Sequence, residues 1–344
     1  MKEPLTIFSN DWHIKESNKE QIIDLVKQKC ELASSLNIDK VFCLGDIFES
    51  RIAQRLDVLN TFNQILDIFE SYKIKLISIP GNHDKTVYSS KESFLDSFRR
   101  HPYFDLIDEY KFIQINDSIV LHLIPFFEDN VFLDIFNNIK IFSDYKNILL
   151  SHLAVEGSRN NDGSIVKNER IAPSLFSSFY KVFLGHYHNT QKIGENIFHL
   201  PSIQQNNYGE DNNKGFTILY SDGSHKIIKS KFKEYIKVIV DVDQTSNQEL
   251  ADLRKKYSKD DNNIRFELKG SENILKSIKK DDFVSLGIDV KVKTKEIEAN
   301  LENYSDEVVE HNSSTIKEAF DIFCEKEKLN KDLGIKYLNK KLKK

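Results

Sequence analysis

Residues 1–230 predict a layered α/β sandwich, and two observations support this prediction. Apolar, strand-like runs alternate with amphipathic helical patterns along the stretch, which is typical of parallel sheets covered by helices. Five of the apolar runs end directly in polar residues of the kinds that bind metals. From residue 231 the pattern restarts as a β-α-β-α-β unit, so we expect a second, smaller α/β domain.

The first 80 residues have the order βαβαβ. We expect strands at 5–8, 41–44 and 75–79, and helices at about 18–36 and 55–72. This order implies parallel strands that are joined by right-handed helical crossovers.

The remaining strands of the sandwich come after residue 110. Residues 111–116 and 118–125 predict a hairpin, and apolar runs predict strands at 147–150 and 181–184. Two later runs, 196–200 and 215–220, suggest a second, more antiparallel sheet.

The layout beyond the sandwich predicts three further parts. They are a small α/β domain at 231–295, a polar linker at 296–312 and a helical tail at 313–344. The tail opens with a capping box, Thr315-x-x-Glu318, and carries an apolar stripe that includes Phe320. Because the preceding linker is so polar, we expect the tail to dock on a partner.

The composition is that of an ordinary soluble chain. Its 344 residues are 40% hydrophobic and 30% charged, with a net charge of −4. The sequence lacks a run long enough to cross a membrane, and its beginning does not resemble a signal peptide. Three cysteines lack metal or disulfide spacing, so we expect a cytoplasmic protein without a membrane partner. Residues 226–295 hold 17 Lys and Arg against 12 Asp and Glu, a weak indication of a DNA-binding surface.

Residues of the types that bind metals follow five of the predicted strands. The residues that follow these strands are Asp11 and His13, Asp46, Asn82 to Asp84, His152, and His186 with His188. Because ligands of an open parallel sheet bind beyond the carboxyl ends of its strands, we expect all five groups to meet at one edge.

The types of side chain predict a centre with two metals. Carboxylate, imidazole and amide groups together suit Mn²⁺, Fe²⁺ or Zn²⁺. Seven ligands are too many for one tetrahedral ion, whereas two ions about 3.5–4 Å apart would use them all if one carboxylate bridged. Asp46 ends its strand without a second nearby ligand, so we expect it to be the bridge.

The motifs DWH, GDIFESR, GNHD, SH and GHYH occur in this order and resemble those of the calcineurin-like metallophosphoesterases. SNDWHIK and GDIFESR are most similar to the double-strand-break repair nucleases of this family, such as the SbcD proteins and the recombination endonuclease subunit of T-even phages. The resemblance covers residues 4 to about 220. It implies a four-layer α/β/β/α sandwich with a small capping domain that binds DNA.

The resemblance also implies a role for each motif residue. Asp11, His13 and His188 would bind one metal, Asn82, His152 and His186 the other, and Asp46 both, with Mn²⁺ as the expected ion. His83 would give a proton to the leaving oxygen, and Asp84 would hold and polarise the His83 ring. At Glu49 some relatives have a functional histidine, so the roles of Glu49 and Arg51 stay open.

The implied function is that of the nuclease subunit of an SbcCD-type complex. It would be a homodimer that hydrolyses DNA from duplex ends and cuts single strands or hairpins, together with an SMC-like ATPase that binds the tail. A phosphatase or cyclic-nucleotide phosphodiesterase is the alternative, and a scaffold without metals that tethers the ATPase to DNA is a third possibility. The other histidines and Trp12 lack ligand spacing, so packing or surface positions are expected for them.

Overall fold

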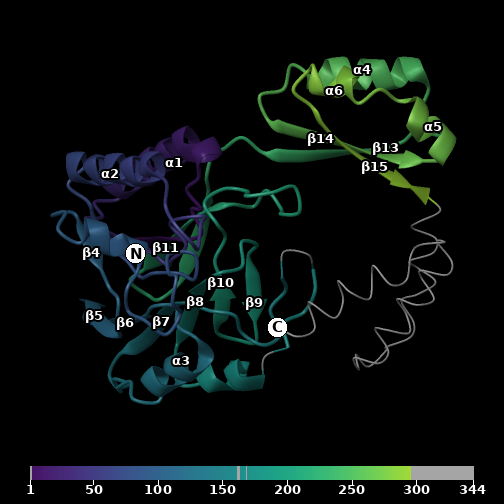
Figure 1. Cartoon of the computed structure of the whole chain (residues 1–344). Helices are drawn as coiled ribbons and strands as arrows, with labels where there is room; N and C mark the ends of the chain where they lie inside the picture. Colours follow the sequence, from purple (N-terminus) through teal and green to yellow (C-terminus); the bar gives the residue numbers. More distant parts are fainter. Residues whose placement is uncertain (1, 161–162, 168, 296–344) are drawn as a thin grey trace. The chain divides into compact units, whose positions relative to one another are not determined.

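A computed structural model describes residues 2–160, 163–167 and 169–295 (Figure 1). The predicted linker at 296–312 and tail at 313–344 lie outside the described residues. The chain divides into two compact units, one made of residues 1–238 and 256–265, the other of 239–255 and the described residues from 266 onward. The larger unit contains two six-stranded sheets, and a separate three-stranded sheet follows them in the chain.

The first sheet has the strand order β12-β11-β1-β2-β3-β4. Strands β1 to β4 are parallel, whereas β11 is antiparallel to both β1 and β12. The elements are β1 (Pro4–Ser9), α1 (Lys19–Ser35), β2 (Lys40–Cys43), α2 (Leu56–Ser71), β3 (Lys75–Ser78), β4 (Phe104–Leu106), β11 (Gly215–Tyr220) and β12 (His225–Lys229). The predicted βαβαβ start is therefore confirmed.

The second sheet has the order β5-β6-β7-β8-β10-β9. Its centre, β6 to β10, is parallel, and the predicted hairpin of β5 and β6 forms one edge. The elements are β5 (Lys111–Asn116), β6 (Ile119–Ile124), α3 (Asp129–Phe136), β7 (Lys146–His152), β8 (Lys181–Gly185), β9 (Gln191–Ile193) and β10 (Ile197–His199).

One strand prediction is wrong. The runs at 196–200 and 215–220 do not share an antiparallel sheet, because β10 pairs in parallel with β8 while β11 joins the first sheet beside β1. Both runs are apolar and short, and such runs carry no information about their partner strand. The pairing is decided by the packing of the two sheets.

Alternating side chains along the strands produce four layers. In β1, Ile7 packs with α1 and α2, whereas its neighbour Phe8 packs between the two sheets. In β7, Leu150 belongs to the inter-sheet core, and Leu149 packs against α3 on the opposite face. The result is the predicted α/β/β/α sandwich, in which both faces of each sheet are buried.

The three-stranded sheet has the order β13-β14-β15, and its helices lie together on one face (Figure 1). Its elements are β13 (Tyr235–Asp241), α4 (Asn247–Tyr257), β14 (Asn263–Gly270), α5 (Glu272–Ser277), α6 (Asp281–Val284) and β15 (Asp289–Thr294). Two short helices, α5 and α6, connect β14 to β15, and α5 ends where Ile278 adopts an extended backbone conformation.

Candidate metal centre

The carboxyl ends of five strands present the polar motif residues. Asp11 and His13 follow β1, Asp46 follows β2, and Asn82 follows β3 of the first sheet. His152 ends β7, and both His186 and His188 follow β8 of the second sheet. The structure brings all seven residues into one cluster, to which each of the two sheets contributes.

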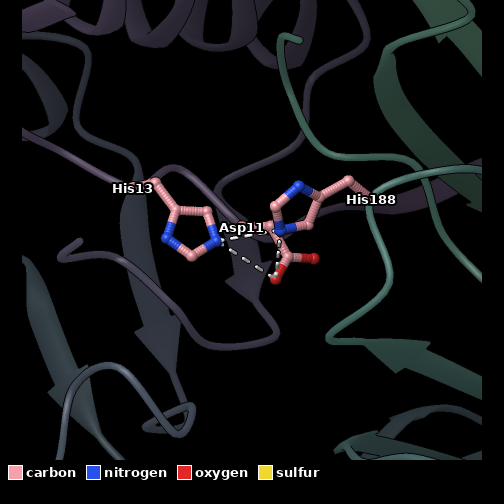
Figure 2. Close-up of side chains that lie close together, drawn as sticks. All are labelled: Asp11, His13 and His188. Carbon is pink, nitrogen blue, oxygen red and sulfur yellow. Dashed lines mark hydrogen bonds and ion pairs between the residues drawn. The ribbon is translucent and has the colours of Figure 1, made fainter. Parts of the chain in front are cut away.

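Asp11, His13 and His188 form one half of the cluster (Figure 2). The Nε2 atoms of His13 and His188 are 3.0 Å apart, and they lie 3.9 and 4.0 Å from Oδ1 of Asp11. Asp11 and His13 are fully or almost fully buried. The three groups thus direct one oxygen and two nitrogens at a common point, as ligands of one cation would.

Asn82, His152 and His186 form the other half. Oδ1 of Asn82 lies 2.9 Å from Nε2 of His152 and 2.9 Å from Nδ1 of His186, and these two nitrogens are 3.3 Å apart. His152 and Asn82 are buried. Burial and the charge of a protonated His152 hold the pKa of His186 well below its usual range, so this imidazole is neutral and available as a ligand.

Asp46 lies between the two halves. Its Oδ2 atom is 3.7 Å from Nε2 of His13 and 3.3 Å from Nε2 of His152. Burial alone would raise the pKa of Asp46, but the facing imidazoles of His152 and His13 outweigh it and hold the pKa well below its usual range. Asp46 is therefore an anion in contact with both halves, as a bridging ligand must be.

Contacts of the outer ring nitrogens test whether the cluster suits cations. Nδ1 of His13 lies 2.9 Å from Oε2 of Glu49, and Nδ1 of His188 lies 2.8 Å from Oε1 of Glu210. Nδ1 of His152 is 2.8 Å from the carbonyl oxygen of Leu44. In the neutral imidazoles the proton therefore belongs on Nδ1, and each Nε2 directs a lone pair into the cluster. The residues present fit two divalent cations.

Without a cation, a proton takes its place. Burial lowers the pKa of His152, but the charge of Asp46 more than offsets this and raises the pKa to about 9. A cation that enters the site therefore displaces a proton from His152, so metal binding and proton release are coupled.

The backbone at the cluster is strained. Among the described residues other than glycine, six have a positive φ, and four of these are candidate ligands: Asp11 at 51°, His13 at 47°, Asp46 at 54° and His186 at 90°. Such conformations are uncommon for these residue types and persist where the surroundings impose them, typically at functional sites.

Two glycines allow the strand ends to approach closely. A Cβ atom on Gly45, whose φ is +93°, would lie 2.7 Å from both Cα of Gly81 and Nδ1 of His152. A Cβ atom on Gly81 would lie 2.2 Å from Oδ1 of Asp46. Neither position accepts a side chain, so both glycines are required for the ligands to meet.

His83 lies beside the cluster and is about one-fifth exposed. Its Nδ1 atom is 2.5 Å from the carbonyl oxygen of Glu49, and its Nε2 atom is 2.7 Å from the guanidinium of Arg51 and 4.0 Å from Oδ2 of Asp46. Burial lowers the pKa of His83, so its ring is neutral at neutral pH. The proton on Nδ1 points to Glu49, and Nε2 faces the site.

The role predicted for Asp84 is wrong. Its carboxylate does not hold the His83 ring but accepts hydrogen bonds from the backbone N–H groups of Ile47, Phe48 and Gly81. Both nitrogens of the ring have other partners, as described above. Asp84 instead ties the loop after β2 to the loop after β3, and through them it fixes the backbone at Asp46 and Asn82.

A pocket of about 550 Å³ opens at the cluster. It is lined by His13, Asp46, Glu49, Arg51, His83, Asn160, His186, Tyr187, His188, Asn206 and Asn207. Among the described residues that line it, Arg51 alone has a permanently positive side chain, and it is exposed. The pocket therefore places a cation and a neutral imidazole on the same side of the candidate metal centre, where an anionic substrate would bind.

The sequence profile of the family described as calcineurin-like phosphoesterase matches residues 5–190. The chain belongs to this family. Its members use a dimetal centre to hydrolyse phosphoesters, so the chain is a phosphoester hydrolase, and the cluster described above holds candidate residues for such a centre.

Individual relatives of this phosphoesterase are distant. A protein of Invertebrate iridescent virus 6 named as phosphoesterase 244L is 25% identical over 289 residues, which cover 81% of this chain and 98% of the viral protein. A dimetal phosphatase from Danio rerio is 13% identical with a TM-score of 0.43, and covers 63% of this chain and 93% of its own. The nuclease MPE of Pseudomonas putida is 14% identical with a TM-score of 0.28, and covers 58% and 68%.

The phosphoesterase has site residues to which sequence reasoning gave no role. Glu49 contacts His13, Arg51 contacts His83, and Glu210 contacts His188. The roles of Glu49 and Arg51 stay open in the sequence, because both residues lie in the GDIFESR motif, which lacks the histidine that some relatives have there. Glu210 follows GHYH by 22 residues, and only the close spacing of Glu210 and Lys214 in the loop sequence could have indicated a buried pair.

The remaining predictions for single residues concern packing. Trp12 is fully buried, and His122 and His199 are buried with hydrogen-bond partners outside the cluster, so the packing expected for them is confirmed. His311 lies outside the described residues. In the part of the chain that the structure describes, each helix is too short or too polar to cross a lipid bilayer.

Proposed function

We propose that this phosphoesterase is a metal-dependent DNA nuclease, the nuclease subunit of an SbcCD-type repair or recombination complex. The observation that carries the proposal is where two motifs lie. SNDWHIK and GDIFESR, which resemble those of double-strand-break repair nucleases, supply Asp11, His13 and Asp46 to the cluster and Arg51 to the pocket above it. The substrate phosphate would be a phosphodiester of DNA.

In this proposal, the seven candidate ligands bind the two cations on which hydrolysis depends. Asp11, His13 and His188 would hold one divalent cation, Asn82, His152 and His186 the second, and Asp46 both. When bound, the two ions lower the pKa of water and offset the charge that develops on the phosphate. Asp46 and Asp11 would balance the charge of the cations, and the contacts at Nδ1 of His13, His152 and His188 would keep the Nε2 lone pairs of these three rings aimed inward.

His83 and Arg51 would handle the substrate. As water attacks phosphorus and the bond to the leaving oxygen breaks, that oxygen needs a proton, and Nε2 of His83 is the atom placed to give it. In the structure this nitrogen contacts Arg51. A phosphate that binds in the pocket would draw the guanidinium away from His83, so that Arg51 contacts phosphate and His83 takes up the proton it later donates.

The small three-stranded sheet supports DNA as the substrate. Its helix-covered face buries apolar side chains, including Phe266 and Leu268 of β14. The opposite face carries basic side chains on every strand: Lys237, Arg265, Lys269, Lys291 and Lys293. Acidic side chains on the same face number fewer: Asp241, Glu267 and Asp289. A basic surplus on this sheet face favours phosphate backbones.

The proposal includes a homodimer and an ATPase partner. The resemblance places the dimer contact on α2 and the segment around 93–99, and two large apolar side chains near the start of α2, Ile52 and Leu56, are 87% and 73% exposed. Sedimentation of the purified protein tests this, since a monomer at all concentrations would contradict it. Binding of an SMC-like ATPase through residues 313–344 is tested by deleting that tail and measuring whether the two proteins still copurify.

A direct activity assay tests the nuclease proposal. The purified protein is incubated with Mn²⁺ and, in parallel, with linear duplex DNA, a single-stranded or hairpin DNA, a chromogenic phosphodiester, a phosphomonoester and a cyclic nucleotide. We expect cleavage of the DNA substrates that stops when a chelator is added. Hydrolysis of the monoester or the cyclic nucleotide without DNA cleavage would instead favour a phosphatase or cyclic-nucleotide phosphodiesterase.

A further inference from the structure

We propose that Glu210 is a positioning residue of the metal centre, which holds His188 in the orientation and tautomer needed to bind the first cation. This inference rests on the proposed two-metal function and adds a residue to it. Glu210 lies in the loop between β10 and β11, far from the motifs in sequence, and its side chain is fully buried.

The two carboxylate oxygens of Glu210 have different partners. Oε1 accepts a hydrogen bond from Nδ1 of His188 at 2.8 Å and one from the side-chain amide of Asn207 at 2.8 Å. Oε2 lies 3.0 Å from Nζ of Lys214 and accepts a hydrogen bond from the backbone N–H of Asn206 at 3.2 Å. One oxygen thus serves the candidate ligand, and the other anchors the loop.

The contact with Oε1 decides what His188 can do. A carboxylate next to Nδ1 requires the ring proton there, so the lone pair of a neutral His188 is on Nε2. Figure 2 shows that this second nitrogen points at His13 and Asp11, with the Nδ1 edge of the ring turned away from them. A rotated ring or the other tautomer would present an N–H group or a carbon edge to the cation instead.

Lys214 holds the same histidine from its backbone. Its buried Nζ atom donates to the carbonyl oxygen of His188 at 2.7 Å and to Oδ1 of Asn189 at 2.8 Å. Glu210 and Lys214 therefore hold both the ring and the main chain of one ligand. The same loop sends Asn206 and Asn207 to the wall of the substrate pocket, so the position of Glu210 also fixes that wall.

Glu210 and Glu49 each lie next to Nδ1 of a candidate ligand, but the contact of Glu210 has hydrogen-bond geometry, that of Glu49 does not, and their surroundings differ. Glu49 lies 2.9 Å from Nδ1 of His13, but 43% of its side chain is exposed, whereas the side chain of Glu210 is 0% exposed. Water can replace an exposed carboxylate as acceptor, but it has no such access at Glu210. The loss of Glu210 should therefore affect metal binding more than the loss of Glu49.

The test measures binding of Mn²⁺ alone, by calorimetry, to the full chain and four variants. Glu210→Ala removes the acceptor, Glu210→Gln keeps an amide oxygen for Nδ1, and Lys214→Met breaks the ion pair but leaves Glu210 next to His188. Glu195→Ala, whose side chain is fully exposed, is the control. Thermal unfolding is recorded for each variant without metal.

We expect the wild-type protein and Glu195→Ala to bind two ions. Glu210→Ala should keep one ion at wild-type affinity and bind the other about 10–100-fold more weakly, with Glu210→Gln in between. Lys214→Met, which also removes the hydrogen bond to the main chain of His188, should unfold at a lower temperature and weaken the binding of that ion less than Glu210→Gln does. If Glu210→Ala does not fold, the inference is tested by Glu210→Gln alone, which should bind one of the two ions more weakly than the wild type does.

Two results would overturn the inference. One is wild-type affinity for both ions in both Glu210 variants. The other is an equal loss in Lys214→Met and Glu210→Gln, since the loop and not the contact with His188 would then matter. A wild-type protein that binds fewer than two Mn²⁺ ions would instead contradict the metal centre of the proposed function, and this is seen before any variant is compared.

Discussion

The Nε2 atoms of His13 and His188 lie 3.0 Å apart, although 175 positions separate the two residues in the sequence. Each ring has a carboxylate at its Nδ1 atom, so in the neutral form both Nε2 atoms carry lone pairs. Two lone pairs that face each other in a buried site repel, and a cation between them removes this cost. The pair therefore suits two ligands of one cation, and we expect the folded protein to bind metal.

Removal of metal should therefore lower stability as well as activity. At a concentration 100 times its dissociation constant, a ligand stabilises the folded state by about 2.7 kcal/mol. For a domain of this size we expect a chelator to lower the melting temperature by roughly 5–10 °C per ion bound. Scanning calorimetry before and after dialysis against a chelator measures this.

The control for that experiment is restoration. Mn²⁺ added back to the metal-free protein should recover both the melting temperature and phosphodiester cleavage, whereas Ca²⁺, which prefers six to eight oxygen ligands, should recover neither. An unchanged melting temperature in the chelator would argue against a folded state that binds metal.

Replacing Asp46 by asparagine should weaken the binding of both ions. Its Oδ2 atom faces His13 in one half of the cluster and His152 in the other, so the anion that serves both is lost. We expect hydrolysis to fall by more than the roughly 100-fold that follows the loss of an outer partner of a ligand. Metal analysis of the purified variant and an assay with Mn²⁺ measure this, and Asp105→Asn, a partly exposed carboxylate on the edge strand β4, is the control. Two tightly bound ions in Asp46→Asn would exclude the bridge.

Replacing His83 by alanine should slow the chemistry without removing metal. His83 lies beside the cluster, and under the proposed function it protonates the leaving oxygen, a contribution worth about 10²–10⁴-fold in rate. The loss should be large for DNA, whose leaving alkoxide needs a proton, and small for a nitrophenyl ester, whose leaving group does not. Turnover of both substrates at saturating Mn²⁺ tests this. An equal loss for both would show that His83 does not act as an acid.

The buried Lys29 predicts a pH dependence of stability that is unrelated to the metal centre. Its Nζ atom contacts Ser9 at 3.0 Å and lies over the rings of Trp12 and Phe69 at 4.4 and 5.0 Å, and among residues 2–160, 163–167 and 169–295 no carboxylate lies within ion-pair distance of it. Burial lowers the pKa of Lys29 from 10.5 to about 8. Below pH 8 the folded and the unfolded chain both hold the proton, so the folded state bears the full cost of burying the charge.

That cost disappears as the pH rises. Between pH 8 and 10.5 the folded state releases the proton first, so the free energy of unfolding of the wild type rises relative to that of Lys29→Met. The difference between the two proteins should change by about 3 kcal/mol over this range. Urea unfolding at pH 7, 8.5 and 10 measures it, and Lys27→Met, on the same helix with its side chain half exposed, should show no such change. A constant difference for Lys29→Met would mean that its pKa is not lowered.

Much of the fold and the ligand set could be predicted from the sequence because both depend on local patterns. A short apolar run followed by Asp11, Asp46 or His152 indicates both a strand and a candidate metal ligand at its carboxyl end. The sequence does not predict which strands pair with each other, because β10 and β11 look alike in sequence and join different sheets.

Contacts between distant side chains could not be predicted in the same way. Asp84 directly follows His83 in the sequence, which predicts a contact between them, but the turn directs the carboxylate of Asp84 to the backbone of Ile47, Phe48 and Gly81. Glu210 gives no local signal, because its partner His188 is set by how a loop folds back. Sequence patterns indicate the ligands, whereas the groups that hold the ligands depend on tertiary structure.

The division of the ligands between the two sheets bears on the order of events during folding. A chain that has formed only the first sheet holds Asp11, His13, Asp46 and Asn82, and a chain that has formed only the second holds the remaining three. Neither half alone offers a complete coordination shell, so tight capture of the ions has to wait until the sheets have stacked. Ions that bind at this late stage should slow the separation of the two sheets. They should leave the rate at which the sheets assemble nearly unchanged.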